Sequence, residues 1–216
     1  MIKGIIFDLD GTLLNTIVDI TNSVNAVLED YGYGAYSVKE IMTMVGHGFK
    51  EMLRKALPAK ASEEQLNEAV EKFAYYYGQY YSDNSKPFDG IIDMLKELQN
   101  RGIKIAINTN KEEGSALVLV KENFEGIEFF DVKGQKENRP TKPDPFCANI
   151  IAEAMGFEKN EILFVGDSST DIKTGTALGV STIGVTWGYR AEEELVKAGA
   201  TYVINEPNAI IDIISK

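Results

Sequence analysis

The chain has 216 residues, of which 44% are hydrophobic and 25% charged, a composition typical of a globular protein long enough to form one domain or two small ones. Its formal net charge of -11 argues against nucleic acid or an anionic membrane as a partner. No apolar run approaches the length of a membrane span, and the N-terminus leads into a strand pattern rather than a signal peptide, so we expect a cytoplasmic location. The oligomeric state is left open, and a monomer is compatible with the sequence.

The first predicted element is a buried strand that ends in two aspartates. Residues 4–7 form an apolar run bounded by glycine, and the sequence D-L-D-G-T follows directly at residues 8–12. Two carboxylates at the carboxyl end of a buried strand repel each other, and apolar packing cannot offset that repulsion. One interpretation is that a divalent cation holds the carboxylates together and that one of them reacts. The alternative is a polar turn, which Asp-Gly pairs often mark.

Residues 15–83 show only helical patterns. Apolar residues recur at spacings of three and four in stretches that begin near residues 17, 37, 49 and 62. Ser37, with Glu40 three residues later, matches a capping box at the start of the second stretch. The last stretch runs to about Tyr81, and its tyrosines are expected to pack within the helical segment. This segment is therefore predicted to be all-helical.

From Pro87 onward, helical and strand patterns alternate. Strands are predicted near 103–108, 129–132, 161–166, 181–185 and 202–204, and helices near 89–101, 112–123, 143–155, 170–179, 190–198 and 207–215. Such alternation indicates a parallel sheet with helices on both faces, and the first strand belongs to it. We therefore predict an α/β fold whose discontinuous core comprises residues 1–14 and 84–216. Residues 15–83 are inserted into it as a separate helical domain.

Three further polar patterns come after the first. Thr109 ends the strand predicted near 103–108, Lys142 is followed by proline, and the strand near 161–166 runs into G-D-S-S-T-D at residues 166–171. In this order, the four patterns resemble the motifs of the haloacid dehalogenase superfamily. Those motifs are D-x-D-x-T, a strand ending in Ser or Thr, a lysine often followed by proline, and G-D-x-x-x-D.

The resemblance implies a Rossmann-like core in which the first strand lies between the strands that end at Thr109 and Asp167. Asp8 and these two residues would then converge on one crevice at the edge of the sheet. The resemblance also implies that the helical insertion is a cap of the subclass-one type. Two positions depart from the usual pattern: Asn15, where the family often has aspartate, and Asn108, where an apolar residue is usual.

The resemblance assigns a role to each acidic residue of the first and fourth motifs. Asp8 would attack phosphorus, because an ionised carboxylate needs no base to activate it. Asp10 would protonate the leaving oxygen and then deprotonate the attacking water. The implied cofactor is Mg²⁺, held by Asp8, the Asp10 carbonyl oxygen and Asp167. Asp171 is expected to orient the lysine of the third motif or a metal-bound water, and the alternative is that it caps the following helix.

A phosphate site is implied as well. Thr109 would hydrogen-bond a phosphoryl oxygen, and Lys142 would offset the charge that builds up in the transition state. Gly11 permits a tight turn whose N–H groups can face a phosphate at a helix start, and Asn110 completes the expected set.

Residue counts exclude other classes of phosphate enzyme. Cys147 is the only cysteine, and residue 153 is glutamate where the Cys-x5-Arg loop of cysteine-dependent phosphatases needs arginine. The apolar helical spacing around Cys147 predicts a core position. His47 is the only histidine, which excludes histidine-nucleophile phosphatases and multi-histidine metal sites, and the chain has no P-loop motif. Lys111 and Lys136 are rivals of Lys142, but they lack its Lys-Pro context.

As a whole, the resemblance implies a phosphomonoester hydrolase that acts on a small phosphorylated metabolite and is most similar to the phosphoglycolate phosphatases. Pyrophosphate and a sugar phosphate are the nearest alternative substrates. A β-phosphoglucomutase is disfavoured because nothing in the sequence indicates protection of an aspartyl phosphate. A noncatalytic binding protein is disfavoured because the set of motif residues is complete.

His47 and Lys50 lie where glycines at positions 46 and 48 interrupt the helical segment. The resemblance implies that a loop here reaches over the crevice, so both residues are candidates to bind carboxylate or hydroxyl groups of the leaving group. The alternative is an ordinary turn between helices with a solvated histidine.

Overall fold

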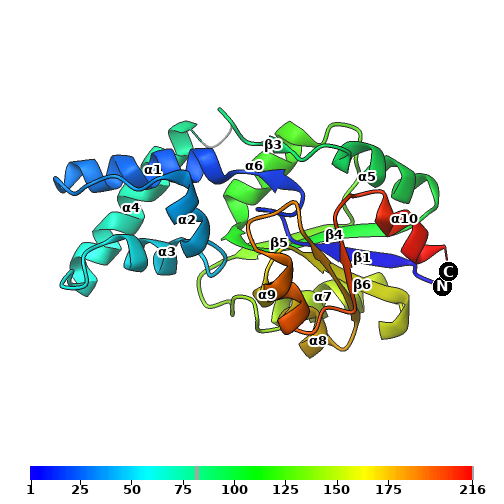
Figure 1. Cartoon of the computed structure of the whole chain (residues 1–216). Helices are drawn as coiled ribbons and strands as arrows, with labels where there is room; N and C mark the ends of the chain where they lie inside the picture. Colours follow the sequence, from blue (N-terminus) through cyan, green and yellow to red (C-terminus); the bar gives the residue numbers. More distant parts are fainter. Residues whose placement is uncertain (81–82, 216) are drawn as a thin grey trace.

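The computed structural model describes residues 1–80 and 83–215 (Figure 1), so Tyr81, the expected end of the last inserted helix, lies outside the described residues. The described residues include a parallel sheet of six strands in the order β5-β4-β1-β6-β7-β8. The strands are β1 (Gly4–Phe7), β4 (Lys104–Glu112), β5 (Asp131–Gln135), β6 (Ile162–Gly166), β7 (Ser181–Val185) and β8 (Tyr202–Ile204). The α/β class is confirmed, and β1 lies between β4 and β6 as expected.

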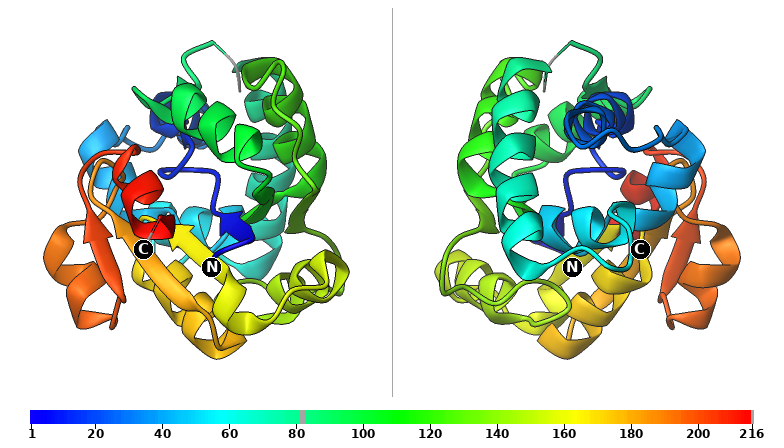
Figure 2. Two further views of the ribbon diagram at one scale, coloured as in Figure 1. Left: turned by 90° about the vertical axis from the view of Figure 1, so that its right-hand side faces the viewer. Right: turned by 90° about the vertical axis from the view of Figure 1, so that its left-hand side faces the viewer.

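Helices cover both faces of this sheet (Figure 2). They are α5 (Ile91–Asn100), α6 (Glu113–Asn123), α7 (Phe146–Met155), α8 (Ser169–Leu178), α9 (Glu192–Lys197) and α10 (Ala209–Ile214). Because side chains alternate along a strand, Ile5 and Phe7 pack with α5, α6 and α10, whereas Ile6 packs with α7 and α8. Helix α9 lies against β7 and β8. We call the sheet and these helices the α/β core.

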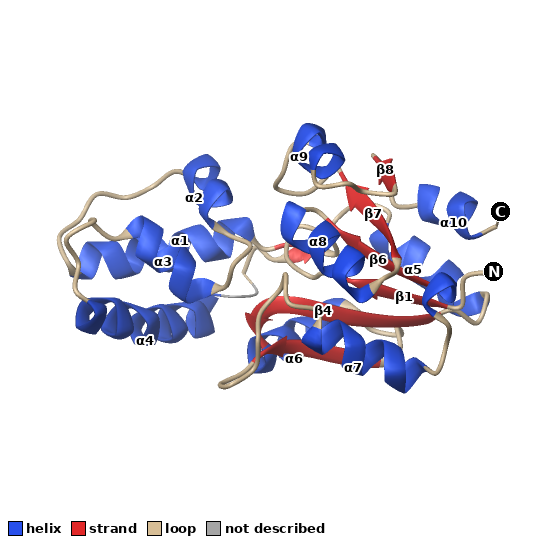
Figure 3. Cartoon of the chain, turned by 90° about the horizontal axis from the view of Figure 1, so that it is seen from below, coloured by secondary structure: helices blue, strands red, loops and turns tan. Residues whose placement is uncertain are grey.

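A second group of helices lies on the side of the sheet toward which the strands run (Figure 3). These helices, which we call the helical unit, are α1 (Ile17–Asp30), α2 (Val38–Met44), α3 (Phe49–Ala56) and α4 (Glu63–Tyr80). They pack around their own apolar core, whose fully buried members all lie within residues 17–77. Helix α2 begins with the predicted capping box between Ser37 and Glu40. None of the described helices is both long and apolar enough to cross a membrane.

Two short strands join the helical unit to the α/β core. Strand β2 (Leu14–Asn15) pairs in antiparallel fashion with β3 (Lys86–Pro87). Beside this pair, the buried carboxylate of Asp19 accepts hydrogen bonds from the backbone and side-chain amides of Asn84 at 2.8–3.2 Å and from the Ser85 hydroxyl at 2.7 Å. The sequence did not predict these strands, because two residues are too few to show a periodicity.

Strand β4 extends beyond its predicted end at residue 108 because it contains a bulge. Asn108 pairs with Lys133 and Glu112 with Gln135, so β4 uses four residue steps where β5 uses two. The extra residues interrupt the regular pairing and turn the side chains of residues 109–111 toward the end of the sheet. A polar run of this kind has no strand periodicity, so the sequence placed these residues after the strand.

Helix α7 begins at Phe146 rather than near residue 143. Just before it, the Asp144 carboxylate accepts a hydrogen bond from the Phe146 N–H at 2.9 Å. The helix starts later because the residues before it form a turn, closed by a hydrogen bond from Asp144 N–H to the Thr141 carbonyl. Cys147 is buried in the first turn of α7, as predicted.

Candidate active site

The polar residues at the carboxyl ends of three adjacent strands meet at one cavity between the α/β core and the helical unit. Asp8 follows β1, Thr109 lies in the bulge of β4, and Asp167 follows β6. The cavity is lined on the core side by Asp8, Asp10, Thr109, Asn110, Lys111, Asp167, Ser168, Tyr189 and Arg190, and on the helical side by Ile20, Val45, Gly46, Gly48, Phe49 and Met52. The expected convergence of Asp8, Thr109 and Asp167 is therefore present.

Asp8 is buried at the end of β1 and is held by two hydrogen-bond donors. Its Oδ1 accepts hydrogen bonds from the Leu9 N–H at 2.7 Å and from the Lys142 ammonium at 2.8 Å. Burial raises the pKa of Asp8 to about 7, and the neighbouring Asp171 and Asp10 charges add to this effect, while Lys142 opposes it. The carboxylate form is thus costly here unless more positive charge is supplied.

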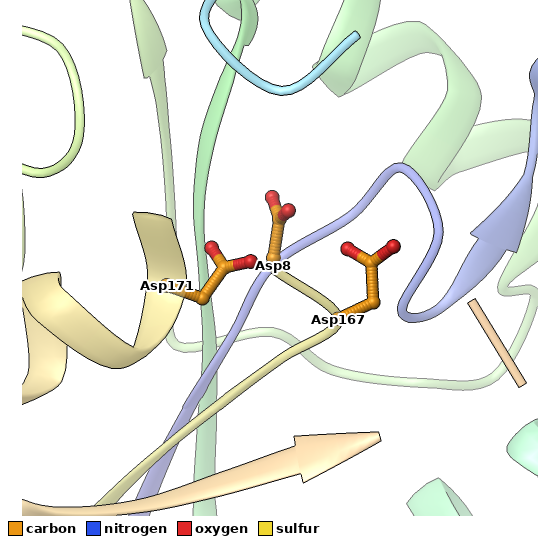
Figure 4. Close-up of side chains that lie close together, drawn as sticks. All are labelled: Asp8, Asp167 and Asp171. Atoms are coloured by element: carbon orange, nitrogen blue, oxygen red, sulfur yellow. The ribbon is translucent and has the colours of Figure 1, made fainter. Parts of the chain in front are cut away.

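Asp8, Asp167 and Asp171 form an acidic cluster (Figure 4), in which one oxygen of each residue lies within 4.8 Å of the others. All three side chains are buried. Burial raises the pKa of Asp167, and the charges of Asp171 and Asp8 raise it further, although the Tyr189 N–H donates to its Oδ2 at 2.7 Å. A set of oxygen donors with excess negative charge fits a hard divalent cation such as Mg²⁺.

Asp171 combines both roles that the sequence left as alternatives. Its Oδ1 accepts a hydrogen bond from the Lys142 ammonium at 2.6 Å. Its Oδ2 accepts from the backbone N–H and hydroxyl of Ser168, at 3.0 and 2.6 Å, which closes a capping box at the start of α8. Burial alone would lower the pKa of Lys142, but the carboxylates of Asp171 and Asp8 outweigh burial and raise that pKa above its ordinary value. Lys142 is therefore held as a cation against Asp8.

Asp10 points into the cavity and is held by two donors. The Thr16 hydroxyl donates to its Oδ1 at 2.6 Å, and the Lys111 ammonium contacts Oδ1 and Oδ2 at 2.9 and 3.1 Å. The Tyr189 hydroxyl accepts from the Thr16 backbone N–H at 2.9 Å. The sequence considered Lys111 only as a rival of Lys142. The other rival, Lys136, forms an ion pair with Glu113 instead.

The predicted phosphate-binding residues are placed in different ways. Thr109 lines the cavity, and its hydroxyl oxygen accepts the Lys111 N–H at 3.2 Å, which leaves the hydroxyl proton able to donate into the cavity. Gly11 has a φ of +85°, and a Cβ there would lie 2.4 Å from Asp167 Oδ2, so glycine is required. Its N–H is already paired with the Leu14 carbonyl at 2.8 Å. The turn leads into β2 rather than a helix start, which differs from the prediction.

Asn110 joins the third motif to the helical unit. Its amide oxygen accepts the Lys142 N–H at 2.8 Å, and its Nδ2 donates to the carbonyls of Lys142 and Gly46 at 3.1 and 2.9 Å. Through these bonds, the Asn110 amide group links the backbone of Lys142 to the backbone of Gly46. Asn110 lines the cavity, but its amide group is engaged in these three hydrogen bonds rather than directed at the predicted phosphate.

Arg190 makes a second connection between the two parts of the molecule. From the loop after β7, its guanidinium donates to the carbonyl of Val45 at 2.7 Å and to that of Met42, at the C-terminal end of α2. Thr16, Tyr189 and Arg190 were missed by the sequence analysis. The only signal for Thr16 was its position four residues after the first motif, and Tyr189 and Arg190 carried none.

The segment 46–50, whose last two residues begin α3, does reach the cavity, but not through its polar side chains. Gly46, Gly48 and Phe49 line the cavity, whereas His47 and Lys50 are exposed. The Lys50 ammonium donates to Asn67 Oδ1 at 2.8 Å on the surface of the helical unit. His47 and Lys50 are thus not brought together with the motif residues in this arrangement, because the glycines and Phe49 occupy the inner side of the turn.

The parallel sheet thus carries buried carboxylates and a buried lysine at its carboxyl edge. The comparison with known families assigns this arrangement to a class of protein. The family model for haloacid dehalogenase-like hydrolases matches residues 5–185. The chain therefore belongs to the haloacid dehalogenase-like hydrolase family.

Individual relatives resemble the chain over nearly its whole length. A phosphoglycolate phosphatase of Haemophilus influenzae (strain Rd) is 29% identical over 220 residues, which cover 98% of this chain and 98% of that protein. Phosphoglycolate phosphatase 1 of Pseudomonas aeruginosa is 29% identical, over 93% of this chain and 75% of its own. A crystal structure from Lactobacillus delbrueckii subsp. bulgaricus, of a protein proposed to be a phosphoglycolate phosphatase, superimposes with a TM-score of 0.92 at 29% identity, covering 98% of each chain.

Proposed function

We propose that this protein is a magnesium-dependent phosphomonoester hydrolase that forms an aspartyl phosphate on Asp8 and takes a small phosphorylated acid, similar to phosphoglycolate, as substrate. The observation that carries the proposal is the cluster of Asp8, Asp167 and Asp171 at the end of β1, in which Lys142 contacts Asp8 and Asp171. The relatives named as phosphoglycolate phosphatases support the substrate class.

In the first half-reaction, the Asp8 carboxylate attacks phosphorus and the bond from phosphorus to the leaving oxygen breaks. Asp10 donates its proton to that oxygen, since its carboxyl group faces the same cavity. Lys142, which contacts Asp8 at 2.8 Å, keeps the carboxylate oriented and offsets charge on the phosphoryl oxygens. The Thr109 hydroxyl is placed to donate to one of those oxygens.

In the second half-reaction, water cleaves the aspartyl phosphate. Asp10, now ionised, removes a proton from the water as it attacks, so one residue serves as acid and then as base. Release of inorganic phosphate regenerates the Asp8 carboxylate and leaves Asp10 protonated for the next cycle.

Asp8, Asp167 and the main-chain carbonyl of Asp10 would hold the magnesium ion. When bound, the ion supplies positive charge that allows an anionic nucleophile and an anionic phosphate to approach each other. Asp171 is committed to Lys142 and Ser168, so we assign it a supporting role rather than a metal-ligand role.

We propose further that residues 15–83 act as a cap that moves on the hinge formed by β2 and β3. The cap side of the cavity carries the apolar side chains Ile20, Val45, Phe49 and Met52. Closure of such a surface excludes water from the reacting groups, which strengthens their electrostatic interactions. A small leaving group suits an enclosed cavity of this kind.

The test is a panel of phosphate esters assayed with the purified full chain and magnesium, ranked by kcat/KM. The panel contains phosphoglycolate, pyrophosphate, sugar phosphates and 4-nitrophenyl phosphate. We expect phosphate release, with a small phosphorylated acid ranked first. In a single turnover, ¹⁸O from labelled water should appear in the released phosphate and not in Asp8, because water attacks the phosphorus of the aspartyl phosphate. Absence of phosphate release from every ester would contradict the proposal, and a higher rank for pyrophosphate or a sugar phosphate would replace the substrate class alone.

A further inference from the structure

Lys111 is a buried cation in the cavity that the reaction described above does not use. Its side chain has no solvent exposure, and its ammonium contacts Asp10 Oδ1 at 2.9 Å and Oδ2 at 3.1 Å. Lysine is almost never buried in this way without a partner, because removing an ammonium from water is costly. The partner here is the carboxylate that serves as acid and base in the proposed reaction.

The other side of the ammonium is covered by the helical unit. The Lys111 Nζ lies 4.6 Å from the ring centroid of Tyr77 in α4 and 5.1 Å from that of Phe49 at the start of α3. The two rings lie 5.4 Å apart and both contact Phe73, so they belong to one aromatic cluster. Cation–π contacts of this kind are strongest when they are shielded from water.

We propose that Lys111 is a positioning residue that aligns Asp10 only when the helical unit is seated on the α/β core. This inference rests on the proposed function. Two oxygens of Asp10 and two aromatic rings surround the ammonium, so Lys111 is engaged with the protein itself rather than open to a ligand. An ammonium can donate both to a carboxylate and to the carbonyl oxygen of a protonated acid, so it can hold Asp10 through both half-reactions.

Separation of the helical unit from the core would replace the two rings with water. Lys111 would then be hydrated and mobile, and the Thr16 hydroxyl would be the remaining side-chain donor to Asp10 described here. Contact of the helical unit with the core would therefore fix Lys111 against Asp10, the residue proposed to transfer the proton. The coupling would limit proton transfer to the state in which the substrate is enclosed.

If Lys111 aligns Asp10, the loss of kcat/KM on removal of Lys111 should depend on the leaving group. An alkyl phosphate has a strongly basic leaving oxygen and needs the Asp10 proton, whereas 4-nitrophenolate leaves without one. We expect Lys111→Met to lower kcat/KM by about a hundredfold for alkyl phosphates. For 4-nitrophenyl phosphate the loss should be less than about threefold, so a plot of log kcat/KM against leaving-group pKa becomes steeper.

Lys104→Met is the matched control. Lys104 lies at the opposite end of the same strand, and its ammonium is also close to two aromatic rings, 4.6 Å from Phe130 and 4.9 Å from Phe157. This variant should leave the slope of the plot unchanged. An equal loss of kcat/KM on alkyl and aryl esters in Lys111→Met, or no loss on either, overturns the proposal.

The role of the helical unit is tested with Tyr77→Leu, which removes a ring but no charge. We expect the same steepening with a smaller amplitude, and an unchanged slope overturns the coupling. Thermal melting is recorded for each variant, and Phe49→Leu replaces Tyr77→Leu if the latter does not fold. Phosphate release by the wild type separates the two proposals. Its absence from every ester of the panel overturns the hydrolase function and this inference with it, whereas its presence with an unchanged slope in Lys111→Met overturns only the role of Lys111.

Discussion

The two sides of the cavity are built from different kinds of contact. On the sheet side, buried charges are paired at short distances, as in the contacts of Lys142 with Asp8 at 2.8 Å and with Asp171 at 2.6 Å. On the helical side, the lining consists of the apolar side chains of Ile20, Val45, Phe49 and Met52 and of two glycines. In the proposed reaction, the sheet side would bind the phosphoryl group by charge, whereas the helical side would select a leaving group mainly by shape and exclusion of water.

The two sides also differ in how they are fixed. Strand pairing sets the position of Asp8, Thr109 and Asp167, because they lie at or just after β1, β4 and β6. The helical unit is linked to the core near the cavity by the side-chain contacts of Asn110, Lys111 and Arg190. A few polar contacts between two separately packed units are consistent with a joint that opens and closes.

On the sheet side, we expect the largest loss of activity from Asp8→Asn. The amide has nearly the same shape but is a poor nucleophile, so we expect kcat to fall by about 10⁴-fold or more. The melting temperature should stay close to that of the wild type, since the substitution removes a charge whose burial is unfavourable. Steady-state kinetics and thermal melting check both points, and turnover near the wild-type rate would exclude Asp8 as the nucleophile.

Removal of divalent metal should also abolish turnover. The carboxylates of Asp8, Asp167 and Asp171 would then be left with Lys142 as the only cation in direct contact with Asp8 among the described residues. Activity should return with magnesium and return poorly with calcium, whose larger and more flexible oxygen shell orients the phosphate less well. Full activity after exhaustive treatment with a chelator would rule out the metal assignment.

A smaller effect is expected from loosening the joint between the two sides. Arg190→Ala removes the hydrogen bonds to the carbonyls of Met42 and Val45, and hydrogen bonds to charged groups contribute about 1.5–3 kcal/mol each. We expect kcat/KM to fall by about tenfold and the radius of gyration in small-angle X-ray scattering to rise.

The matched control for that variant is Arg101→Ala. Arg101 is exposed and bonds to Glu97 and Ser215 on the side of the core away from the cavity. Both its kinetics and its scattering should match the wild type. If Arg190→Ala behaves in the same way, the arginine does not hold the helical unit in place.

The smallest effects should come from His47→Ala and Lys50→Ala. Both side chains are exposed outside the cavity, so kcat/KM should change by less than about twofold on any ester. A loss of about tenfold confined to one natural ester, with 4-nitrophenyl phosphate unaffected, would show that the loop turns these side chains inward when substrate binds. Comparison of the two substrates in each variant decides between these outcomes.

The core of the site could be predicted because its residues follow strands or sit in short local patterns. Asp8, Thr109, Lys142 and Asp167 each carry such a pattern, and parallel pairing brings the three strand ends together. For Asp171 the sequence left two alternatives, because each alternative assumed that the whole carboxylate serves a single partner. In the structure, its two oxygens serve Lys142 and Ser168 separately.

The remaining contacts could not be predicted because they join residues far apart in the chain. Thr16 meets Tyr189 across 173 positions, and Lys111 meets Asp10 across 101. Lys111 lies in the bulge of β4, where its side chain lines the cavity and contacts Asp10. Because no local periodicity indicates a bulge, the sequence identified Lys111 only as a rival of Lys142.

The pairing of β2 with β3 brings the two ends of the inserted segment together. The chain leaves the sheet and returns to it through neighbouring antiparallel strands, which lie about 5 Å apart. A two-residue turn is enough to join strands in that relation. Asn84 and Ser85, which bind the Asp19 carboxylate, precede β3, so the segment between the two strands ends at residue 85 rather than at the predicted residue 83. A gene segment that encodes residues 16–85 can therefore be shortened to a turn or exchanged for another segment without rerouting the chain through the sheet.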